Sequence, residues 1–575
     1  MKKLIFPGFA AFIILILLLL PSISVFADEE VKTDTPYSFN VSSRTLYVGW
    51  KSYLCDIKGT GENSVVTYRS DDETIATVSD EGEIFPVSAG KTKIYADIKE
   101  GKKTYTCSMK VTVKEPYTKI SAQTDVMTLN SSFTFNLKRY GHRTPVSWTL
   151  AGEGLAEIES ASPSSCVITA KNPGTVTLNA VCGDDSYTFN IKIYNGEGEL
   201  FIVTPDSEPY NGNYLKYGTY NTKTAHYYLL RSYLERLNTL KGGVLVLKEG
   251  TYTITNSLCI PSNTTIILED GVRIVKSDDT GTSALTATSS LFQTVSFTNA
   301  AKEGVFSGYN GEHDIKILGE GKAVIDLNNI VCQGIVSAHC KNLTISGITF
   351  MNMNTYHFIE VDATYNAEIS NNYFYGAFES ATTRKEAINI DTPDKNTGGF
   401  SQLWTSYDKT ANKNIYITDN VFYNVECGVG THKYSEGFAH KNITILRNTF
   451  IDCKTYAIRC MNWETPLIRD NSFVYSVLPE YSKISILVNG CTNPMITENR
   501  FENIETPVSC FHWYNTGYGS EYAPIYNTLD SRCTEALKHN YVVNVINPYW
   551  EYYEVLDDFS DDNLVKNPFD GYQLP

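Results

Sequence analysis

The chain has 575 residues, of which 42% are hydrophobic and 19% are charged. At roughly 100–200 residues per domain, this length predicts about three or four domains, and the hydrophobic share excludes a wholly disordered chain. The formal net charge of −16 argues against nucleic acid as the main partner, because phosphate binding depends on an excess of lysine and arginine. Tyrosine dominates the aromatic residues, with 39 Tyr against 26 Phe and 6 Trp. Since tyrosine combines an apolar ring with a polar tip, a β-rich protein with a polar or sugar-like partner is the first hypothesis.

Residues 1–27 have the pattern of a secretory signal peptide. Lys2 and Lys3 give a positive start, residues 9–20 form an apolar run, and Val25-Phe26-Ala27 supplies a small-residue cleavage site. The alternative is an uncleaved membrane anchor, which the short apolar run disfavours. No later segment is long and apolar enough to span a membrane, so we expect a secreted protein, with attachment to the cell surface left open. Residues 28–37 are polar and acidic and are interpreted as a linker.

Thirteen cysteines follow the predicted cleavage site, which is an odd number. Secretion permits disulfides, and Cys55 with Cys107, like Cys166 with Cys182, falls within one predicted small domain. The sequence does not determine which of these cysteines form disulfides. The later cysteines mostly follow a strand repeat, where a small buried apolar side chain is the expected role. No CxxC or Cys/His spacing indicates a zinc or redox site.

Residues 38–115 contain short alternating strands separated by turns, as in residues 65–72, 75–79 and 89–96. So many strands in so short a segment predict a β-sandwich. The stretches SDDETIATVS and AGKTKI resemble the bacterial immunoglobulin-like group 2 domain, which implies a spacer or surface-display module.

Residues 116–195 look like a second, degenerate copy of this domain. VSWTL at residues 146–150 stands where VTYRS stood, and PGTVTL at residues 173–178 stands where AGKTKI stood. Direct ligand binding is the alternative to a spacer role.

The pattern changes at about residue 196. Residues 224–240 have apolar side chains at helical spacing and predict one amphipathic helix, which Lys241-Gly242-Gly243 ends. Short apolar segments between residues 244 and 268 then predict successive strands. A lone helix followed by strand after strand is typical of a cap on a solenoid.

A repeat of the form Ile-x-x-Asn-x-Phe then recurs every 23–28 residues, with one doubled gap between Phe374 and Phe422. Self-similarity at this period indicates one coil per repeat. We expect the Ile and Phe side chains to fill the interior, and the Asn side chains to bond along a ladder and to take the left-handed backbone of a bend. The leucine-rich alternative lacks its Leu-x-x-Leu-x-Leu pattern, so a right-handed parallel β-helix is predicted. The aligned positions are Ile345, Ile369, Ile417, Ile445, Ile468 and Ile496; Asn372, Asn420, Asn448, Asn471 and Asn499; and Phe350, Phe374, Phe422, Phe450, Phe473 and Phe501.

The predicted helix, GGVLVLKEGTYTI, NTTIILEDG and the coils after Lys341 resemble the pectate-lyase-like β-helix superfamily over roughly residues 200–540. This resemblance implies a right-handed parallel β-helix, which we place over residues 196–545. Together with the two predicted sandwiches it gives an all-β chain, and residues 546–575 form an acidic and aromatic tail. The superfamily includes polysaccharide lyases, hydrolases of the polygalacturonase type, epimerases and phage tailspikes, so the fold does not choose the reaction. Trimers occur in it, and the oligomeric state is open.

A second strand of each coil can also be aligned, and its side chains alternate between the two faces. Ile359 and Val361, with their equivalents, must point inward. By the same alternation Glu386 would face inward, unless its strand starts after it. The outward set is Glu360, Asp362, Asn389, Asp391, His432 and Arg459. Since adjacent strands lie about 4.8 Å apart, these side chains predict one patch of carboxylates, a histidine and an arginine. Neighbouring charges push the pKa values of such carboxylates apart, which gives the proton donor and the ionised partner that acid/base cleavage of a glycosidic bond requires.

The order acid, acid, His, Arg on successive coils is similar to that of polygalacturonase-type hydrolases. The resemblance carries their acid positions to Asp362 and Asp391, their histidine to His432 and their arginine to Arg459. The chain differs in lacking a Gly-Asp-Asp pair and a Gly-His-Gly motif, and in having Cys460-Met461 in place of Ile-Lys.

A long loop leaves the site directly after Asp391, and long loops in compact folds are often functional. We expect it to wall the patch, with Trp404 and Tyr407 stacking on sugar rings; packing on the solenoid surface is the alternative. The candidate substrate-binding residues are His357, Asn389, Trp404, Tyr407, Asp408, Lys433, Tyr434, Asn462 and Trp463.

Three functions are compatible with these residues. The first is a polysaccharide hydrolase in which Asp362 and Asp391 act as acid and base, His432 assists and Arg459 binds a substrate carboxylate. The second is a lyase in which Ca²⁺, held by Glu360, Asp362 and Asp391, neutralises a uronate. The third is a non-catalytic glycan-binding adhesin. The expected partner is a polysaccharide or surface glycan, and Ca²⁺ is the one candidate cofactor.

Overall fold

The computed structural model describes most of the chain after the predicted linker. The described residues are 35–142, 144–377, 385–477, 484–513, 516–517, 520–521, 525–548, 550–555 and 564–566. The predicted signal peptide, most of the linker and most of the tail lie outside them. Among the described residues, no helix has the length and apolar character needed to cross a membrane.

The first described domain is a β-sandwich, as predicted. One sheet has the strand order β2-β9-β8-β5 and the other β3-β7-β6, with β1 paired to β4. Alternating side chains of β8 and β9 close the core, which includes Ile94, Ile98 and Val111. The strands are β1 (Ser38–Phe39), β2 (Ser43–Tyr47), β3 (Tyr53–Leu54), β4 (Ile57–Lys58), β5 (Val65–Ser70), β6 (Ala76–Val78), β7 (Glu83–Pro86), β8 (Gly90–Glu100) and β9 (Lys103–Lys114).

The second domain is also a sandwich of two four-stranded sheets, with orders β10-β12-β15-β14 and β11-β17-β16-β13. Its strands are β10 (Tyr117–Ala122), β11 (Val126–Thr128), β12 (Ser132–Tyr140), β13 (Ser147–Ala151), β14 (Ala156–Ala161), β15 (Ser165–Ala170), β16 (Gly174–Cys182) and β17 (Asp185–Tyr194). In both sandwiches the candidate disulfide partners Cys55, Cys107, Cys166 and Cys182 are buried free thiols. These cysteines therefore pack as small apolar side chains.

The solenoid begins with a helical cap. Helix α1 (Ala225–Leu240) packs against the first strands of the β-helix and ends at Lys241, whose backbone is left-handed with φ of 64°. Its buried face includes Tyr228, Leu234 and Leu237. This face covers the open end of the first coil, as the sequence pattern predicted.

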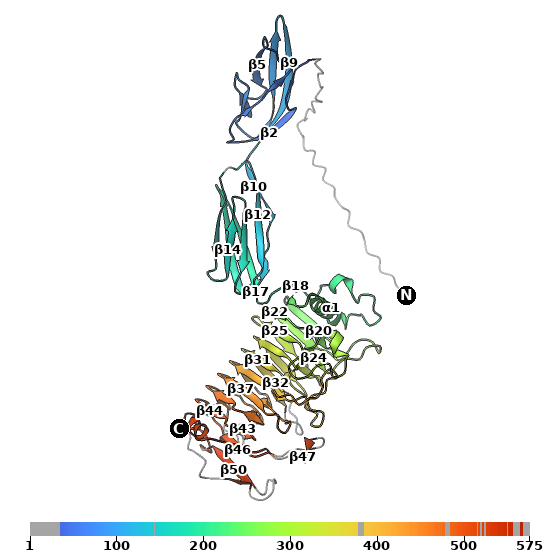
Figure 1. The fold of residues 1–575 in the computed structure, drawn as a ribbon, viewed down its shortest axis with the longest axis vertical. Helices are drawn as coiled ribbons and strands as arrows, with labels where there is room; N and C mark the ends of the chain where they lie inside the picture. Colours follow the sequence, from blue (N-terminus) through green and yellow to red (C-terminus); the bar gives the residue numbers. More distant parts are fainter. Residues whose placement is uncertain are drawn as a thin grey trace, which may run out of the picture. The chain divides into compact units, whose positions relative to one another are not determined.

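Three long parallel sheets form the β-helix, and Figure 1 shows their strands stacked coil upon coil. The β18–β44 sheet contains β18 (Leu200–Val203), β19 (Gly243–Leu247), β22 (Thr264–Leu268), β25 (His313–Gly319), β28 (Lys341–Ser346), β31 (Tyr365–Ser370), β34 (Lys413–Thr418), β37 (His440–Leu446), β41 (Leu467–Arg469) and β44 (Met495–Thr497), with β40 (Trp463–Glu464) beside β37. The β20–β49 sheet contains β20 (Gly250–Ile254), β23 (Val272–Lys276), β26 (Val324–Asp326), β29 (Thr349–Met353), β32 (Tyr373–Ala377), β35 (Val421–Tyr423), β38 (Thr449–Ile451), β42 (Ser472–Val474), β45 (Arg500–Glu502) and β49 (Tyr541–Val543). The β21–β51 sheet contains β21 (Leu258–Cys259), β24 (Ser290–Gln293), β27 (Gln333–Ala338), β30 (Ile359–Asp362), β33 (Glu386–Asp391), β36 (Cys427–Gly430), β39 (Tyr456–Met461), β43 (Ile484–Asn489), β46 (Thr506–Phe511), β50 (Glu551–Val555) and the antiparallel β51 (Leu564–Lys566).

Short elements complete the described chain. They are η1 (Tyr210–Gly212), α2 (Phe297–Ala300), α3 (Ser531–Leu537) and the hairpin of β47 (Thr516–Gly517) and β48 (Ser520–Glu521). Strand β50 pairs with β46 and so continues the β21–β51 sheet beyond residue 545, the predicted end of the solenoid.

The interior ladders of the repeat are confirmed. Consecutive Phe rings from Phe350 to Phe501 stack 4.7–5.0 Å apart, with interplanar angles of 4–11°. The buried Asn ladder runs from Asn372 to Asn499 and extends to Asn540, each Nδ2 donating to the next Oδ1 at 2.9–3.1 Å. Phe374 pairs directly with Phe422, so the doubled gap is an insertion within one coil and adds no Phe rung.

The sequence predicts the left-handed backbone of the bend at the ladder asparagines. In the structure it lies at the residue before each of them. These residues are Asn371, Asp419, Arg447, Asp470 and Glu498, with φ of 55–58°. The ladder Asn is thereby turned inward, where its amide also donates to a main-chain carbonyl of the preceding coil, such as Asn448 Nδ2 to Ile417 at 2.8 Å.

Candidate functional site

The polar patch predicted on the second strand of each coil lies on the outer face of the β21–β51 sheet. Parallel pairing puts Asp362 of β30 opposite Asp391 of β33, and Glu360 opposite Asn389. The second row continues through Gly430 of β36. The structure therefore brings these residues together on consecutive coils.

Arg459 of β39 ends the row, opposite Gly430. A Cβ on Gly430 would lie 3.0 Å from the Cβ of Arg459 and 3.1 Å from the Cγ of Glu386, so a side chain there would crowd both neighbours. The guanidinium of Arg459 lies over the ring of Trp513, 5.2 Å from its centroid. Glycine at this position leaves room for the charged side chains around it.

Glu386 belongs to the same cluster, and the inward orientation that alternation gave it is wrong. Ala387 and Ile388 both contribute to the interior core, so alternation breaks at this point of β33. The Glu386 carboxylate consequently lies on the outer face, 3.4 Å from the Nδ1 atom of His432. We call Glu360, Asp362, Glu386 and Asp391 the acid cluster.

His432 sits at the centre of the site. Its Nδ1 atom lies 3.1 Å from Oδ1 of Asn389 and 3.4 Å from Oδ2 of Asp391, in addition to its contact with Glu386. Oε2 of Glu386 and Oδ2 of Asp391 each lie 3.4 Å from this nitrogen, so the two oxygens are separated by at most twice that distance. The His432 side chain is 27% exposed, which makes it the more open end of an otherwise buried group.

His357 lies behind His432. Its Nδ1 atom is 2.8 Å from the main-chain carbonyl of Glu386, and the two imidazole rings are 5.5 Å apart between centroids. Burial lowers the pKa of His357 to about 3, and burial together with the charge of Arg459 lowers the pKa of His432 to about 3. Both rings are neutral at neutral pH.

The acid cluster is buried without a full set of partners. Its four side chains are 0–3% exposed, and several carboxylate oxygens accept no hydrogen bond from the described residues. These oxygens are Oε2 of Glu360, both of Asp362, both of Glu386 and Oδ2 of Asp391. Burial raises the pKa of Glu386 to about 8 and that of Asp391 to about 6. It also raises the pKa of Glu360 and Asp362 well above the usual range, helped by the nearby carboxylates. Because buried unpaired acids destabilise a fold, such a group indicates a functional site.

The long loop after Asp391 contacts the site through its first part and through its last residue, Asn412, whose Nδ2 donates to the main-chain carbonyl of Asp391 at 2.8 Å. Lys433 Nζ donates to the carbonyl of Gly398 at 3.1 Å. The later part returns to earlier coils, where Trp404 packs against Phe306 and Phe400 and is 1% exposed. The ring of Trp404 has no open face for a sugar in this arrangement, which corresponds to the alternative of packing on the solenoid.

Other candidate substrate-binding residues of the loop are also engaged within the fold. The hydroxyl of Tyr407 donates to the carbonyl of Gln402 at 3.2 Å. Asp408 accepts main-chain N–H groups from Thr410 and Gly308. The hydrogen bonds of Tyr407 and Asp408 therefore hold the loop in its conformation.

Beyond β36, the candidates Tyr434, Asn462 and Trp463 are buried. Trp463 lies in the interior core and its Nε1 donates to Thr431 Oγ1 at 2.8 Å. Asn462 Nδ2 donates to the carbonyl of Ser435 at 3.1 Å. These three side chains are therefore buried within the fold and do not line the surface beside His432.

Two separate sets of side chains could hold a cation. Glu360, Asp362 and Asp391 offer unbonded carboxylate oxygens, the donor type that Ca²⁺ prefers, so the Ca²⁺ hypothesis stays a prediction. His357, Glu386 and His432 offer two ring nitrogens and a carboxylate within 4.8 Å of one another. The sequence does not reveal the set of His357, Glu386 and His432, because alternation gives Glu386 an inward orientation and no local motif joins residues from three coils.

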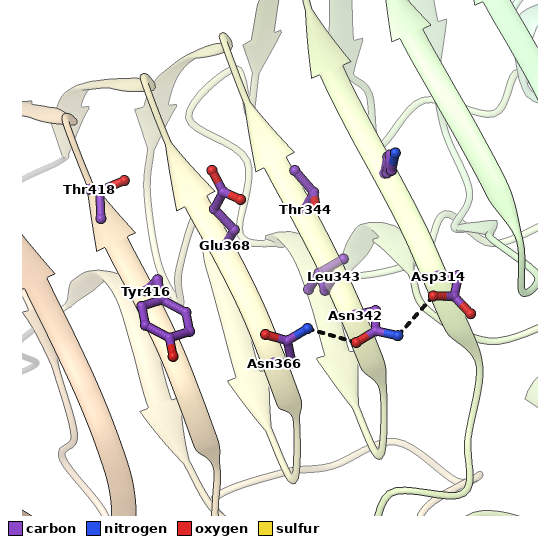
Figure 2. A pocket seen from close by; sticks show the side chains of 9 residues that line it. Asp314, Asn342, Leu343, Thr344, Asn366, Glu368, Tyr416 and Thr418 are labelled. Atoms are coloured by element: carbon purple, nitrogen blue, oxygen red, sulfur yellow. Dashed lines mark hydrogen bonds between the residues drawn. The ribbon is translucent and has the colours of Figure 1, made fainter. Parts of the chain in front are cut away.

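A groove of about 390 Å³ on the β18–β44 sheet lies elsewhere on the solenoid. Figure 2 shows its Asp314, Asn342 and Asn366 linked by hydrogen bonds along the coils, with Tyr416 beside them. Its charged groups are satisfied, since Lys316 donates to Asn195 and Glu368 accepts from Ser370. The groove lacks the unbonded acids that mark the outer face of the β21–β51 sheet, which is therefore the better candidate for chemistry.

No protein-family model matches the chain, and no curated protein matches it in sequence. Solved structures do match. The surface adhesin PfbA of Streptococcus pneumoniae aligns at 16% identity with a TM-score of 0.41, over 60% of this chain and 77% of the adhesin chain. Polygalacturonase of Erwinia carotovora aligns at 13% identity with a TM-score of 0.30, over 46% of this chain and 72% of that enzyme. The S-layer protein SbsC aligns at 16% identity with a TM-score of 0.21, over 28% of each chain. These low identities transfer no activity, and the fold class rests on the three parallel sheets themselves.

Proposed function

We propose that the chain is an extracellular enzyme that hydrolyses a glycosidic bond of a polysaccharide at the acid cluster. The observation that carries the proposal is the pairing of Asp362 and Asp391 at equivalent positions of adjacent parallel strands. Two carboxyl groups in different surroundings are what acid/base cleavage of a glycosidic bond requires. The signal-peptide pattern of residues 1–27 supports an extracellular location.

The surroundings of the two aspartates differ, and this difference supports a separate role for each. Oδ1 of Asp391 accepts main-chain N–H groups from His432 at 3.2 Å and Lys433 at 3.3 Å, which favours the ionised form. Neither carboxylate oxygen of Asp362 accepts a hydrogen bond from the described residues, which favours the neutral form. Asp362 is therefore the general acid, and Asp391 is the carboxylate that acts as nucleophile or base.

The separation of the two groups favours a retaining reaction. Adjacent parallel strands lie about 4.8 Å apart, close to the roughly 5–5.5 Å between the carboxyl groups of retaining glycosidases. A separation of about 6.5–9.5 Å, which leaves room for a water molecule, is typical of inverting enzymes. Asp391 would then form a covalent glycosyl intermediate that water releases.

Basic residues at the site favour an acidic sugar. Arg459 and Lys433 follow the acid cluster on the next coils, and Arg459 is a side chain suited to bidentate recognition of a carboxylate. Local positive charge of this kind would offset the net charge of −16 for a uronate-containing chain.

The experiment that tests the proposal is a screen of the full chain on acidic and neutral polysaccharides, with Ca²⁺ and with EDTA. Hydrolysis predicts new reducing ends without an unsaturated product, and NMR of the first-formed product should show the anomeric configuration of the substrate. An ultraviolet-absorbing unsaturated uronate formed only with Ca²⁺ would instead support the lyase. Glycan binding without turnover in any condition would contradict the enzyme and favour the adhesin.

A further inference from the structure

Three side chains that are distant in the sequence meet at one point of the site. His357 precedes β30 by two residues, Glu386 is the first residue of β33, and His432 follows β36 by two residues. The stacking of three consecutive coils brings two ring nitrogens and one carboxylate oxygen within 4.8 Å of one another.

The spacing of these groups suits a bound metal ion. With bonds of about 2.0–2.2 Å, two donor atoms of a tetrahedral zinc site are separated by about 3.4 Å. Nδ1 of His432 and Oε2 of Glu386 are 3.4 Å apart. An imidazole nitrogen at this distance from a carboxylate oxygen resembles the donor pairs of three-ligand zinc sites, which keep a fourth position open.

An independent observation shows that, within the described part of the chain, the Glu386 carboxylate lacks hydrogen-bond donors. Glu386 is 0% exposed, yet neither of its carboxylate oxygens accepts a hydrogen bond from the described residues. A buried carboxylate without partners costs several kcal/mol, and a bound cation removes that cost. The orientation of His357 is fixed as well, because its Nδ1 lies 2.8 Å from the Glu386 carbonyl and donates to it. This hydrogen bond leaves the lone pair on Nε2, as in histidine ligands whose other nitrogen is bound to a carbonyl.

We propose that His357, Glu386 and His432 bind a divalent transition-metal ion of the zinc type. Two imidazole nitrogens with one carboxylate suit zinc and its neighbours in the first transition series, whereas Ca²⁺ and Mg²⁺ prefer oxygen donors alone. The site is distinct from the Glu360, Asp362 and Asp391 set considered for Ca²⁺. The inference stands apart from glycoside hydrolysis, because it is tested without any substrate.

The test uses the full chain, stripped of metal by a chelator and titrated with ZnCl₂ in competition with a chromogenic zinc chelator. Bound zinc per chain is counted by mass spectrometry after gel filtration. We expect one zinc per wild-type chain, and a loss of affinity of at least about 100-fold in Glu386→Gln and in His432→Gln, since even replacing a residue that only orients a metal ligand costs about 10–100-fold. His539→Gln, which removes an exposed histidine, and Asp362→Asn should bind zinc like the wild type.

Two further measurements keep the inference falsifiable if a variant folds poorly. Zinc should raise the melting temperature of the wild type and not that of Glu386→Gln, because only a ligand of the native state stabilises it. Cobalt added in place of zinc should give the visible absorption of a tetrahedral site in the wild type and lose it in His357→Gln. The inference is overturned if the wild type retains no zinc, if Glu386→Gln and His432→Gln bind zinc normally, or if Ca²⁺ alone binds with the stoichiometry expected for zinc.

Discussion

Asp362 and Asp391 occupy the same position on neighbouring coils, but among the described residues only the carboxylate of Asp391 accepts main-chain N–H groups. The difference arises from the segment after β36, where the chain turns at His432 and Lys433 and directs two N–H groups at the Asp391 carboxylate. Identical side chains one rung apart are thus given unlike environments. This asymmetry is the basis of the acid and nucleophile roles proposed for them.

Replacing either aspartate tests this assignment. Asp362→Asn and Asp391→Asn should each reduce polysaccharide hydrolysis by about 10²–10⁴-fold, the usual contribution of such a group. A substrate with a good leaving group needs no general acid, so it should restore most of the activity of Asp362→Asn and none of that of Asp391→Asn. Initial rates on an aryl glycoside and on the polysaccharide provide the comparison. Asp419→Asn, which changes a half-exposed aspartate outside the site, is the matched control. Equal rescue of both variants would contradict the assignment.

The burial of Glu360 predicts a pH-dependent gain in stability when its charge is removed. Burial and the nearby Asp391 raise the pKa of Glu360 in the folded state, so the folded chain holds its proton over a range in which the unfolded chain has lost it. The stability that this proton provides is complete below the unfolded pKa of about 4.3 and is lost as the pH rises toward the folded pKa. Glu360→Gln should therefore match the wild type near pH 4 and exceed its unfolding free energy by about 1–3 kcal/mol at neutral pH.

Scanning calorimetry of both chains at several pH values checks this, with the solvent-exposed Glu436→Gln as control. A stability difference that is constant with pH would show that Glu360 is not protonated in the fold. A gain in stability combined with a loss of hydrolysis would mark Glu360 as a residue kept for function.

The buried Asn ladder should contribute far more to stability than the exposed one. Nδ2 of Asn448 donates to Oδ1 of Asn471 at 3.0 Å, and its own Oδ1 accepts from Asn420. Asn448→Ala leaves donors and acceptors unsatisfied inside the solenoid, so we expect a loss of about 2–4 kcal/mol. Asn442→Gly removes a similar bond to Asn414 on the surface, where water replaces it, and glycine accepts the left-handed backbone there (φ of 54°), so this change should cost less than about 0.5 kcal/mol. The melting temperatures of the two variants test this prediction. Similar losses of stability in both variants would contradict it.

The ladders could be predicted from the sequence because every coil repeats the same requirement. A residue such as Phe422 contacts its equivalents above and below, so the period of the pattern is also the period of the packing. The outward direction of Asp362 and Asp391 followed from alternation for the same reason. Glu386 could not be placed, because a single break in alternation at Ala387 is a local backbone event with no repeating signal. The position of the loop after Asp391 could not be predicted either. It depends on a β-bridge between Thr405 and Phe306, and Phe306 lies about one hundred residues earlier in the chain.

Trp404 allows the structural and sugar-binding roles of that loop to be separated. Its ring is buried against Phe306, and its Nε1 donates to Oε1 of Gln293 at 3.0 Å. Trp404→Phe keeps an aromatic ring in this position and removes the hydrogen bond, so we expect a loss of about 1–3 kcal/mol in stability, because Gln293 is left with a buried unsatisfied oxygen. The Michaelis constant for the polysaccharide should not change, because the ring does not reach the acid cluster. A Michaelis constant raised tenfold with an unchanged melting temperature would instead show that the indole binds a sugar ring, and that the loop opens to expose it during turnover.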